Sequence, residues 1–162
     1  MGVSGSGKST LLHALTARLG WRGLEADELH SASNVSKMGR GIPLADADRR
    51  PWLDAVAADI SRWKAEGISG VVACSALGRW SRDRLRAADP DCLFVYLEAS
   101  ADLIESRLKS RTGHFMPATL AKSQFDALEA PDPEERALTI PAGQEIEESV
   151  EQVVAEIARR SG

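Results

Sequence analysis

The sequence predicts an α/β fold of three layers, in which helices cover both faces of a mainly parallel sheet. Three observations support this prediction. The segment Gly2–Ser9 fits the pattern G-x-x-x-x-G-K-[ST] and runs directly into the helical stretch LLHALTARL. Two apolar runs, 70–77 and 92–99, are typical of buried parallel strands, and a helical pattern follows each of them. Because strands and helices alternate without an internal repeat, we expect one domain over residues 1–162 around a doubly wound sheet.

The segment Gly2–Ser9 has the composition of a loop that cradles phosphate groups. Glycines at positions 2, 5 and 7 lack a Cβ, so the backbone can turn its N–H groups inward onto an anion. Lys8 would reach the β- and γ-phosphates, and the Ser9 hydroxyl would bind the Mg²⁺ that bridges them. A flexible Gly/Ser linker is the alternative, but a linker has no need for Lys followed by Ser or for a helix immediately afterwards.

A phosphate loop normally follows a buried apolar strand, and no such strand precedes Gly2 in this sequence. Two explanations are open. Met1 is an internal residue of a longer natural chain, or the sheet is built without its first strand. The first explanation is favoured, because an absent central strand would leave two neighbouring strands with unpaired backbone groups and an open slot in the core.

The first half of the chain predicts two longer helices, a short helix and a short strand. Leu12, Leu15 and Leu19 share one face of a helix that Gly20 ends. A strand at 22–25 would deliver Asp27 to the carboxyl edge of the sheet, where open α/β sheets bind ligands. A short helix is expected at 31–38. After a polar loop, Asp48 is predicted to cap a helix that begins near Pro51 and ends near residue 65.

The second half predicts two buried strands, three further helices, a lid and an edge strand. The expected ranges are strand 70–77, helix 79–88, strand 92–99, helix 101–111, a mobile loop with a helix at 120–128, an edge strand at 137–140 and a helix at 145–160. The segment 112–128 would form the lid.

Composition limits the classes of function. With 43% hydrophobic and 27% charged residues and a net charge of −4, the chain is an ordinary globular protein and a poor candidate for a general nucleic-acid binder. Basic clusters at 79–86 and 107–111 contrast with an acidic segment at 129–151, and most of these charges are predicted to lie on solvated helix faces. Cys74 and Cys92 are expected to be buried thiols in a reducing cytosol. Without a membrane-length apolar run or a signal peptide, a cytoplasmic location is expected.

The phosphate loop predicts a nucleoside triphosphate and Mg²⁺, and other features narrow the class. The sequence has no N-K-x-D guanine motif, no aspartate closes either apolar run, and the lid is cationic, which favours a small-metabolite or nucleotide kinase. Asp27 is the candidate for orienting the acceptor hydroxyl or holding Mg²⁺ through water. The candidates for binding an anionic acceptor are Arg49, His30, Asn34 and Lys37, and those for bracketing adenine and the phosphates are Arg107 and Arg111. Taken singly, each of these charged residues is equally well explained as a surface side chain.

Several runs resemble the gluconate kinase family of small phosphate-loop kinases. They are GVSGSGKST, EADELH, NVSKM, GIPLADADRRPWL, ACSAL, RDRLR, GHFMPATLAKSQFDALE and PDPEERA, and together they cover nearly the whole chain. NVSKM followed by GIPLADADRRPWL, and GHFMP followed by SQF, are not shared by shikimate or adenylate kinases. The resemblance implies a three-layer α/β/α P-loop kinase fold with a short lid, often in a homodimer, that transfers the ATP γ-phosphate to the 6-hydroxyl of D-gluconate.

The resemblance also implies roles for individual residues. ATP phosphates would bind at Ser4, Gly5, Ser6, Gly7, Lys8, Ser9 and Thr10, with Mg²⁺ at Ser9 and with Arg107 on the adenine side. Asp27 and Arg111 would act with Lys8 in catalysis. The positions that match the substrate and lid motifs are Asp27, His30, Lys37, Arg49, Trp52, Ser75, Ala76, Arg111, His114 and Gln124.

Three positions differ from the family pattern: Ser31 stands where Pro is usual, Gly78 where Lys or Arg is usual, and Trp80–Ser81 where Tyr is usual. Arg79 is a candidate to supply the charge that Gly78 lacks; otherwise a phosphate contact is lost. Two other functions remain open at this stage. One is a kinase for another sugar acid or a small polyol, and the other is an ATP-binding protein without catalysis.

Overall fold

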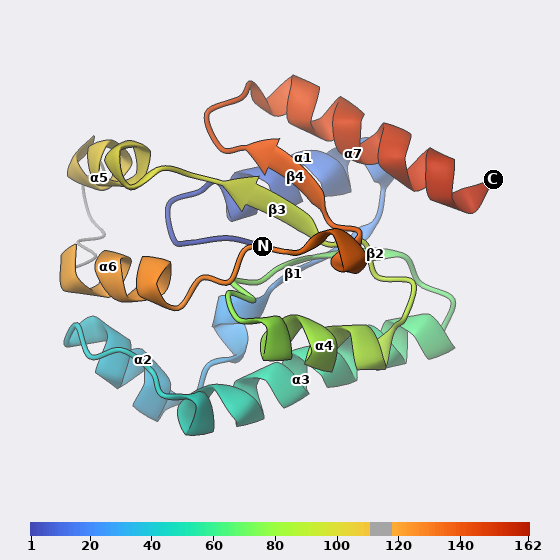
Figure 1. Ribbon diagram of the computed structural model, residues 1–162. Helices are drawn as coiled ribbons and strands as arrows, with labels where there is room; N and C mark the ends of the chain where they lie inside the picture. Colours follow the sequence, from blue (N-terminus) through green and yellow to red (C-terminus); the bar gives the residue numbers. More distant parts are fainter. Residues whose placement is uncertain (111–117) are drawn as a thin grey trace.

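The computed structural model describes residues 1–110 and 118–162 and has the predicted alternation of strands and helices (Figure 1). The elements, in chain order, are α1 (Lys8–Leu19), β1 (Arg22–Glu25), η1 (Ala26–Leu29), α2 (Ala32–Gly39), α3 (Asp46–Ala65), β2 (Gly70–Ala73), α4 (Arg79–Ala88), β3 (Val95–Glu98), α5 (Ala101–Ser110), α6 (Ala118–Asp126), η2 (Pro133–Glu135), β4 (Leu138–Pro141) and α7 (Ile146–Ser161), where η marks a 3₁₀ turn. Helices α1 and α7 lie on one face of the strands and α3 and α4 on the other, which gives the three layers (Figure 1).

The strands form two parallel pairs. β1 pairs with β2 from Arg22↔Gly70 to Glu25↔Ala73, and β3 pairs with β4. The first two residues lie between the pairs: the Gly2 N–H donates to the Ser75 carbonyl at 3.1 Å, and the Met1 carbonyl accepts from the Leu97 N–H at 3.0 Å. The backbone at Met1 and Gly2 therefore joins the carboxyl ends of β2 and β3.

Behind Met1, a cavity of about 790 Å³ continues between β2 and β3. Leu15 and Val153 line it on the α1–α7 side, and Trp63 lines it on the α3 side. We call this cavity the sheet slot. It lies between β2 and β3, which are not paired with each other among the described residues.

Two apolar clusters fill the layers on either side of the strands. Leu11, Leu15, Leu97, Ile140 and Val153 belong to the cluster beneath α1 and α7. The cluster beneath α3 and α4 comprises Ala26, Trp52, Leu53, Val56, Ala57, Cys74, Ala76, Leu85 and Phe94. A smaller cluster, Val3, Leu77 and Ile104, packs the start of the chain against α5. The side-chain spacing predicted from the sequence therefore corresponds to real buried faces.

Helix boundaries agree with the predictions to within about one residue except at α3 and at α6, which covers Ala118–Asp126 and not 120–128. Gly20 ends α1 in the left-handed conformation, with a φ of 67°, and its N–H donates to the Thr16 carbonyl at 2.9 Å. The prediction that α3 begins near Pro51 is wrong, because the helix begins at Asp46. Asp48 still caps it, but from the first turn, where its carboxylate accepts from the Ala45 N–H at 3.0 Å. Packing of the following apolar face outweighs the one backbone hydrogen bond that Pro51 removes.

The two apolar strands are shorter than predicted. β2 covers Gly70–Ala73 and β3 covers Val95–Glu98. Each has a single strand partner among the described residues, so the flanking apolar residues have no second ladder to join. After β2 the chain leaves the sheet and Ala76 takes a φ of 40°, an unusual conformation for a residue other than glycine.

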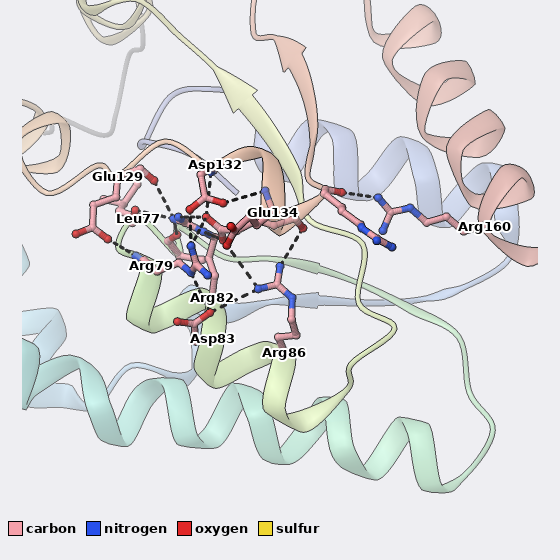
Figure 2. Close-up of polar contacts among 12 residues, drawn as sticks. Leu77, Arg79, Arg82, Asp83, Arg86, Glu129, Asp132, Glu134 and Arg160 are labelled. Carbon is pink, nitrogen blue, oxygen red and sulfur yellow. Dashed lines mark hydrogen bonds and ion pairs between the residues drawn. The ribbon is translucent and has the colours of Figure 1, made fainter.

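The oppositely charged clusters of the sequence meet in the fold. Arg79, Arg82 and Arg86 of α4 lie within ion-pair distance of Asp132 or Glu135. Figure 2 shows the three arginines together with Asp132. The prediction of solvated faces is wrong for Arg82, whose side chain is fully buried. Cys74 is buried, as predicted, whereas Cys92 is partly exposed. Burial raises the pKa of each thiol to about 11. In the described part of the chain, every helix is too short or too polar to span a bilayer.

Candidate active site

The phosphate loop has the backbone conformation that its glycines permit. Gly2, Gly5 and Gly7 have φ values of 138°, 83° and 105°. At Gly2 the approach is also close, since a Cβ there would lie 2.8 Å from the Leu97 carbonyl oxygen. Glycine is therefore required at position 2 both by φ and by space.

Lys8 lies over its own loop. Its ammonium donates to the carbonyls of Gly2 and Val3, each at 3.0 Å. Ser9 and Thr10 are exposed at the start of α1, where the helix N-terminus favours an anion. Within residues 1–110 and 118–162, the buried Ser6 hydroxyl has no hydrogen-bond partner. The loop thus presents a charged group, exposed hydroxyls and an unpaired hydroxyl in a segment of the shape that binds phosphates.

Two lid-side residues contact this loop. Arg107 of α5 donates to the carbonyls of Gly5 at 3.1 Å, Ser6 at 3.2 Å and Ala142 at 2.6 Å. Its place on the adenine side stays a prediction, because these contacts are all with backbone. Gln124 of α6 accepts the Ser4 N–H at 2.6 Å. The lid helix is therefore bonded directly to the phosphate loop.

The acceptor side lies at the same edge of the sheet. β1 and β2 pair in parallel up to Glu25↔Ala73, so Asp27 of η1 and Ser75 both follow strand ends at the same edge of the sheet. The Ser75 carbonyl accepts from Gly2 of the phosphate loop. Asp27 is exposed, so its carboxylate is accessible to a ligand. The weakly marked strand 22–25 is thus confirmed, together with its delivery of Asp27 to the carboxyl edge.

His30 and Trp52 form the wall next to Asp27. Their rings stack with centroids 4.3 Å apart and an interplanar angle of 16°. The Trp52 indole N–H donates to the Ala26 carbonyl at 2.6 Å, so it also holds the backbone before Asp27. Burial lowers the pKa of His30, Asp27 opposes this shift, and Arg49 adds to it. These pKa contributions show that Asp27, His30 and Arg49 share one electrostatic environment.

The buried Asn34 and the ion pair of Lys37 attach α2 to α3. The Asn34 amide contacts His30 Nδ1 at 3.4 Å and donates to the Asp48 carbonyl at 2.9 Å. Lys37 pairs with the Asp48 carboxylate at 2.6 Å, and this hydrogen bond is the main reason that the pKa of Asp48 is lowered. Ser31, which replaces the usual Pro, accepts the Asn34 N–H as the helix cap.

Other candidate residues are paired with acidic side chains or fall outside the described residues. Arg49 lies 3.7 Å from Asp46. The guanidinium of Arg79, the candidate to replace the charge missing at Gly78, is bonded to Asp83 and Asp132. Arg111 and His114 fall in 111–117, outside the described residues. The sequence prediction missed the Arg82–Glu135 ion pair and the contact at Ala142. Arg82 and Glu135 lie in the runs RDRLR and PDPEERA, but nothing in either run indicates burial.

Comparisons with known proteins agree with this arrangement. The AAA domain family model matches residues 1–131. A gluconokinase from Gluconobacter oxydans (strain 621H) is 45% identical over 141 residues, which span 86% of this chain and 79% of the relative.

Two solved structures are similar along nearly their full length. A gluconokinase from Sinorhizobium meliloti 1021 has a TM-score of 0.86 and 41% identity, with 98% of this chain and 89% of the other covered. An unliganded sugar kinase from Janibacter sp. HTCC2649 has a TM-score of 0.91 and 42% identity, with 96% and 90% covered. The chain therefore belongs to the gluconokinase family of P-loop kinases.

Proposed function

We propose that the protein transfers the γ-phosphoryl group of ATP to the 6-hydroxyl of D-gluconate, giving 6-phospho-D-gluconate and ADP. The observation that carries the proposal is that two half-sites, the phosphate loop and the acceptor side around Asp27, meet at one edge of the sheet. The phosphate loop is bonded to Ser75, which follows β2, and Asp27 follows β1, the strand that is paired with β2. The family relatives named gluconokinase support gluconate as the acceptor.

In this mechanism Lys8 leaves the carbonyls of its own loop and binds the β- and γ-phosphates, which replace those carbonyls as partners. Asp27 accepts or orients the proton of the acceptor hydroxyl, and His30, Arg49 and Trp52 surround the gluconate carboxylate and hydroxyls. Arg111 is proposed to stabilise the phosphoryl group in transit, and Ser75, His114 and Gln124 are proposed to complete the substrate site. Catalysis rests on positioning and on charge stabilisation.

Mg²⁺ would be held by the Ser9 hydroxyl together with the nucleotide phosphates. Among the residues that the structure describes, no cluster of three or more His, Cys, Asp and Glu side chains could hold a metal. This donor set fits an ion that arrives with the nucleotide, because Mg²⁺ is usually bound through few protein groups and several phosphate oxygens. Its charge would neutralise the charge developing on the β- and γ-oxygens.

The test is ADP release by the purified protein with Mg²⁺-ATP, with and without D-gluconate, and with a panel of other sugar acids and polyols. Gluconate-dependent ADP and a phosphorylated product of the expected mass would support the proposal. Another acceptor that is turned over faster, or nucleotide binding without any turnover, would overturn it in favour of the other functions considered above.

Asp27→Asn is expected to lower kcat on the order of 10²- to 10⁴-fold, because general-base contributions have that size. Glu28→Gln, the neighbouring exposed carboxylate of η1, is the matched control and should keep wild-type turnover. Equal activity of wild type and Asp27→Asn would remove Asp27 from the mechanism.

A further inference from the structure

Arg82 of α4 and Glu135 of η2 form an ion pair in the interior. Arg82 Nε lies 2.6 Å from one carboxylate oxygen of Glu135 and Nη2 lies 2.7 Å from the other, and the two side chains are 0% and 1% exposed. This hydrogen bond is the main reason that the pKa of Glu135 is lowered. A buried pair of charges is rarely the most stabilising choice, since desolvation offsets much of the attraction. Stability alone therefore does not account for the buried pair, and the other contacts of Arg82 indicate a second role.

The remaining nitrogen of Arg82 binds backbone from two distant segments. Nη1 donates to the carbonyls of Leu77 and Glu129, each at 2.9 Å, and to the Ala76 carbonyl at 3.3 Å (Figure 2). Ala76 and Leu77 belong to the acceptor loop, which we define as residues 75–77 after β2. Glu129 belongs to the lid return, which we define as residues 127–129 after α6. One guanidinium thus contacts both segments and the ion-pair partner.

The acceptor loop and the lid return are also bonded to each other. The Glu129 N–H donates to the Leu77 carbonyl at 3.0 Å, and its carboxylate accepts the Arg79 N–H. In the acceptor loop, Ala76 holds a φ of 40°, which persists only where the surroundings enforce it. Arg82 donates hydrogen bonds to carbonyls of both segments, so it is one of the contacts that hold Ala76 in this conformation.

Both segments lead directly to the phosphate loop. Ser75 of the acceptor loop accepts from Gly2, and α6, which precedes the lid return, places Gln124 on the Ser4 N–H. A shift of the acceptor loop relative to the lid return would therefore change the distance between acceptor and phosphates. Displacements on the order of 1 Å at a reacting centre lower rates on the order of 10²-fold.

We propose that Arg82, held by Glu135, is a positioning residue that fixes the acceptor loop against the lid return and so sets the spacing of the two half-sites. The inference rests on the proposed kinase function for its kinetic consequence. Its structural consequence, a fixed arrangement of residues 75–77 and 127–129, is measurable without turnover.

The test uses three variants. Arg82→Met removes every contact of the guanidinium. Arg82→Lys keeps a positive charge for Glu135 but has no planar fork to reach three carbonyls. The double variant Arg82→Met/Glu135→Leu leaves no uncompensated buried charge, so it is expected to stay folded even if Arg82→Met alone does not. Arg84→Met is the matched control, because Arg84 lies on the same helix and pairs with Asp54 at the surface.

Two measurements are made on each variant that circular dichroism shows to be folded. Hydrogen–deuterium exchange of residues 75–77 and 127–129 is expected to be faster in the double variant and in Arg82→Lys than in wild type and Arg84→Met. The kcat with gluconate should fall on the order of 10²-fold in the same two variants, while the KM for ATP changes by less than about 3-fold.

A folded double variant with wild-type exchange in both segments would overturn the inference, as would faster exchange with an unchanged kcat. Absence of gluconate turnover in the wild-type protein would refute the proposed function instead, and the exchange measurement would still decide whether Arg82 fixes the two segments.

Discussion

Trp52 and Trp63 allow the hydrogen bond behind Asp27 to be measured separately from the burial of an indole ring. Both lie in α3, and both are 5% exposed. The Trp52 N–H donates to the carbonyl of Ala26, a residue that is 0% exposed, whereas the Trp63 N–H has no partner within residues 1–110 and 118–162. Replacing each by Phe removes a similar ring area but has opposite effects on hydrogen bonding.

Trp52→Phe removes a buried hydrogen bond, whose net contribution is about 0.5–1.5 kcal/mol, whereas Trp63→Phe removes a buried donor that had no partner. Trp52→Phe should therefore be less stable than Trp63→Phe by about 0.5–1.5 kcal/mol, with roughly 2–4 °C of Tm for each kcal/mol at this chain length. Urea unfolding followed by circular dichroism gives the free energy of unfolding of each variant, and the m-values show whether the two transitions are comparable.

An equal loss in the two variants, or a larger loss in Trp63→Phe, would refute this reasoning. Trp52→Phe should also have a kinetic effect. Because the Trp52 hydrogen bond holds the residue before Asp27, Trp52→Phe is also expected to raise the KM for gluconate, whereas Trp63→Phe should not.

Two further predictions concern the acceptor wall and the sheet slot. Because the pKa of His30 is lowered from 6.5 in the folded protein, the folded state binds fewer protons than the unfolded state, so stability should be greatest above about pH 6.5 and fall as the pH drops through the lower folded pKa. Between about pH 7 and about pH 5, the free energy of unfolding measured in urea should fall less in His30→Phe than in wild type. His13→Asn, at an exposed histidine, is the control. An equal pH dependence of the free energy of unfolding in all three proteins would contradict this role of His30. Adding about five consecutive apolar residues before Met1 should raise the Tm, because such a strand would pair with β2 and β3 and fill the cavity of about 790 Å³, which is apolar on both faces. A Gly/Ser extension of equal length should leave the Tm unchanged, and an equal rise in Tm with both extensions would show that the sheet slot is not involved.

The sequence predicts most of the fold because its signals are local. The motif at Gly2–Ser9 predicts the loop and its left-handed glycines, and Gly20 marks the end of α1 correctly. The start of α3 was missed for an equally local reason. Ala45 has no capping side chain, and Pro51 usually marks a first turn, so the sequence favours a later start than the one that the packing of α3 supports.

Some residues of the candidate site could be predicted from local sequence patterns, and others could not. Asp27 lies where the end of a strand puts it, as the residue pattern predicts, whereas the place of Trp52 in the site was implied only by the family resemblance. Arg82 could not be recognised, because its partner Glu135 lies 53 residues away and only the fold brings the two together. An arginine on a helix rich in arginine gives no sign of burial. The roles of Arg111 and His114 still rest on family resemblance alone.

The bridge that Met1 and Gly2 form between β2 and β3 has a consequence for the cooperativity of unfolding. β1 and β2 pack on α1, β4 packs on α7, and α1 contacts α7, so the apolar cluster beneath these two helices spans both strand pairs. The backbone bonds of Met1 and Gly2, which also join the two pairs, adjoin the phosphate loop. A nucleotide bound to that loop should therefore slow local opening at the junction of the two pairs as well as raise the stability of the whole fold.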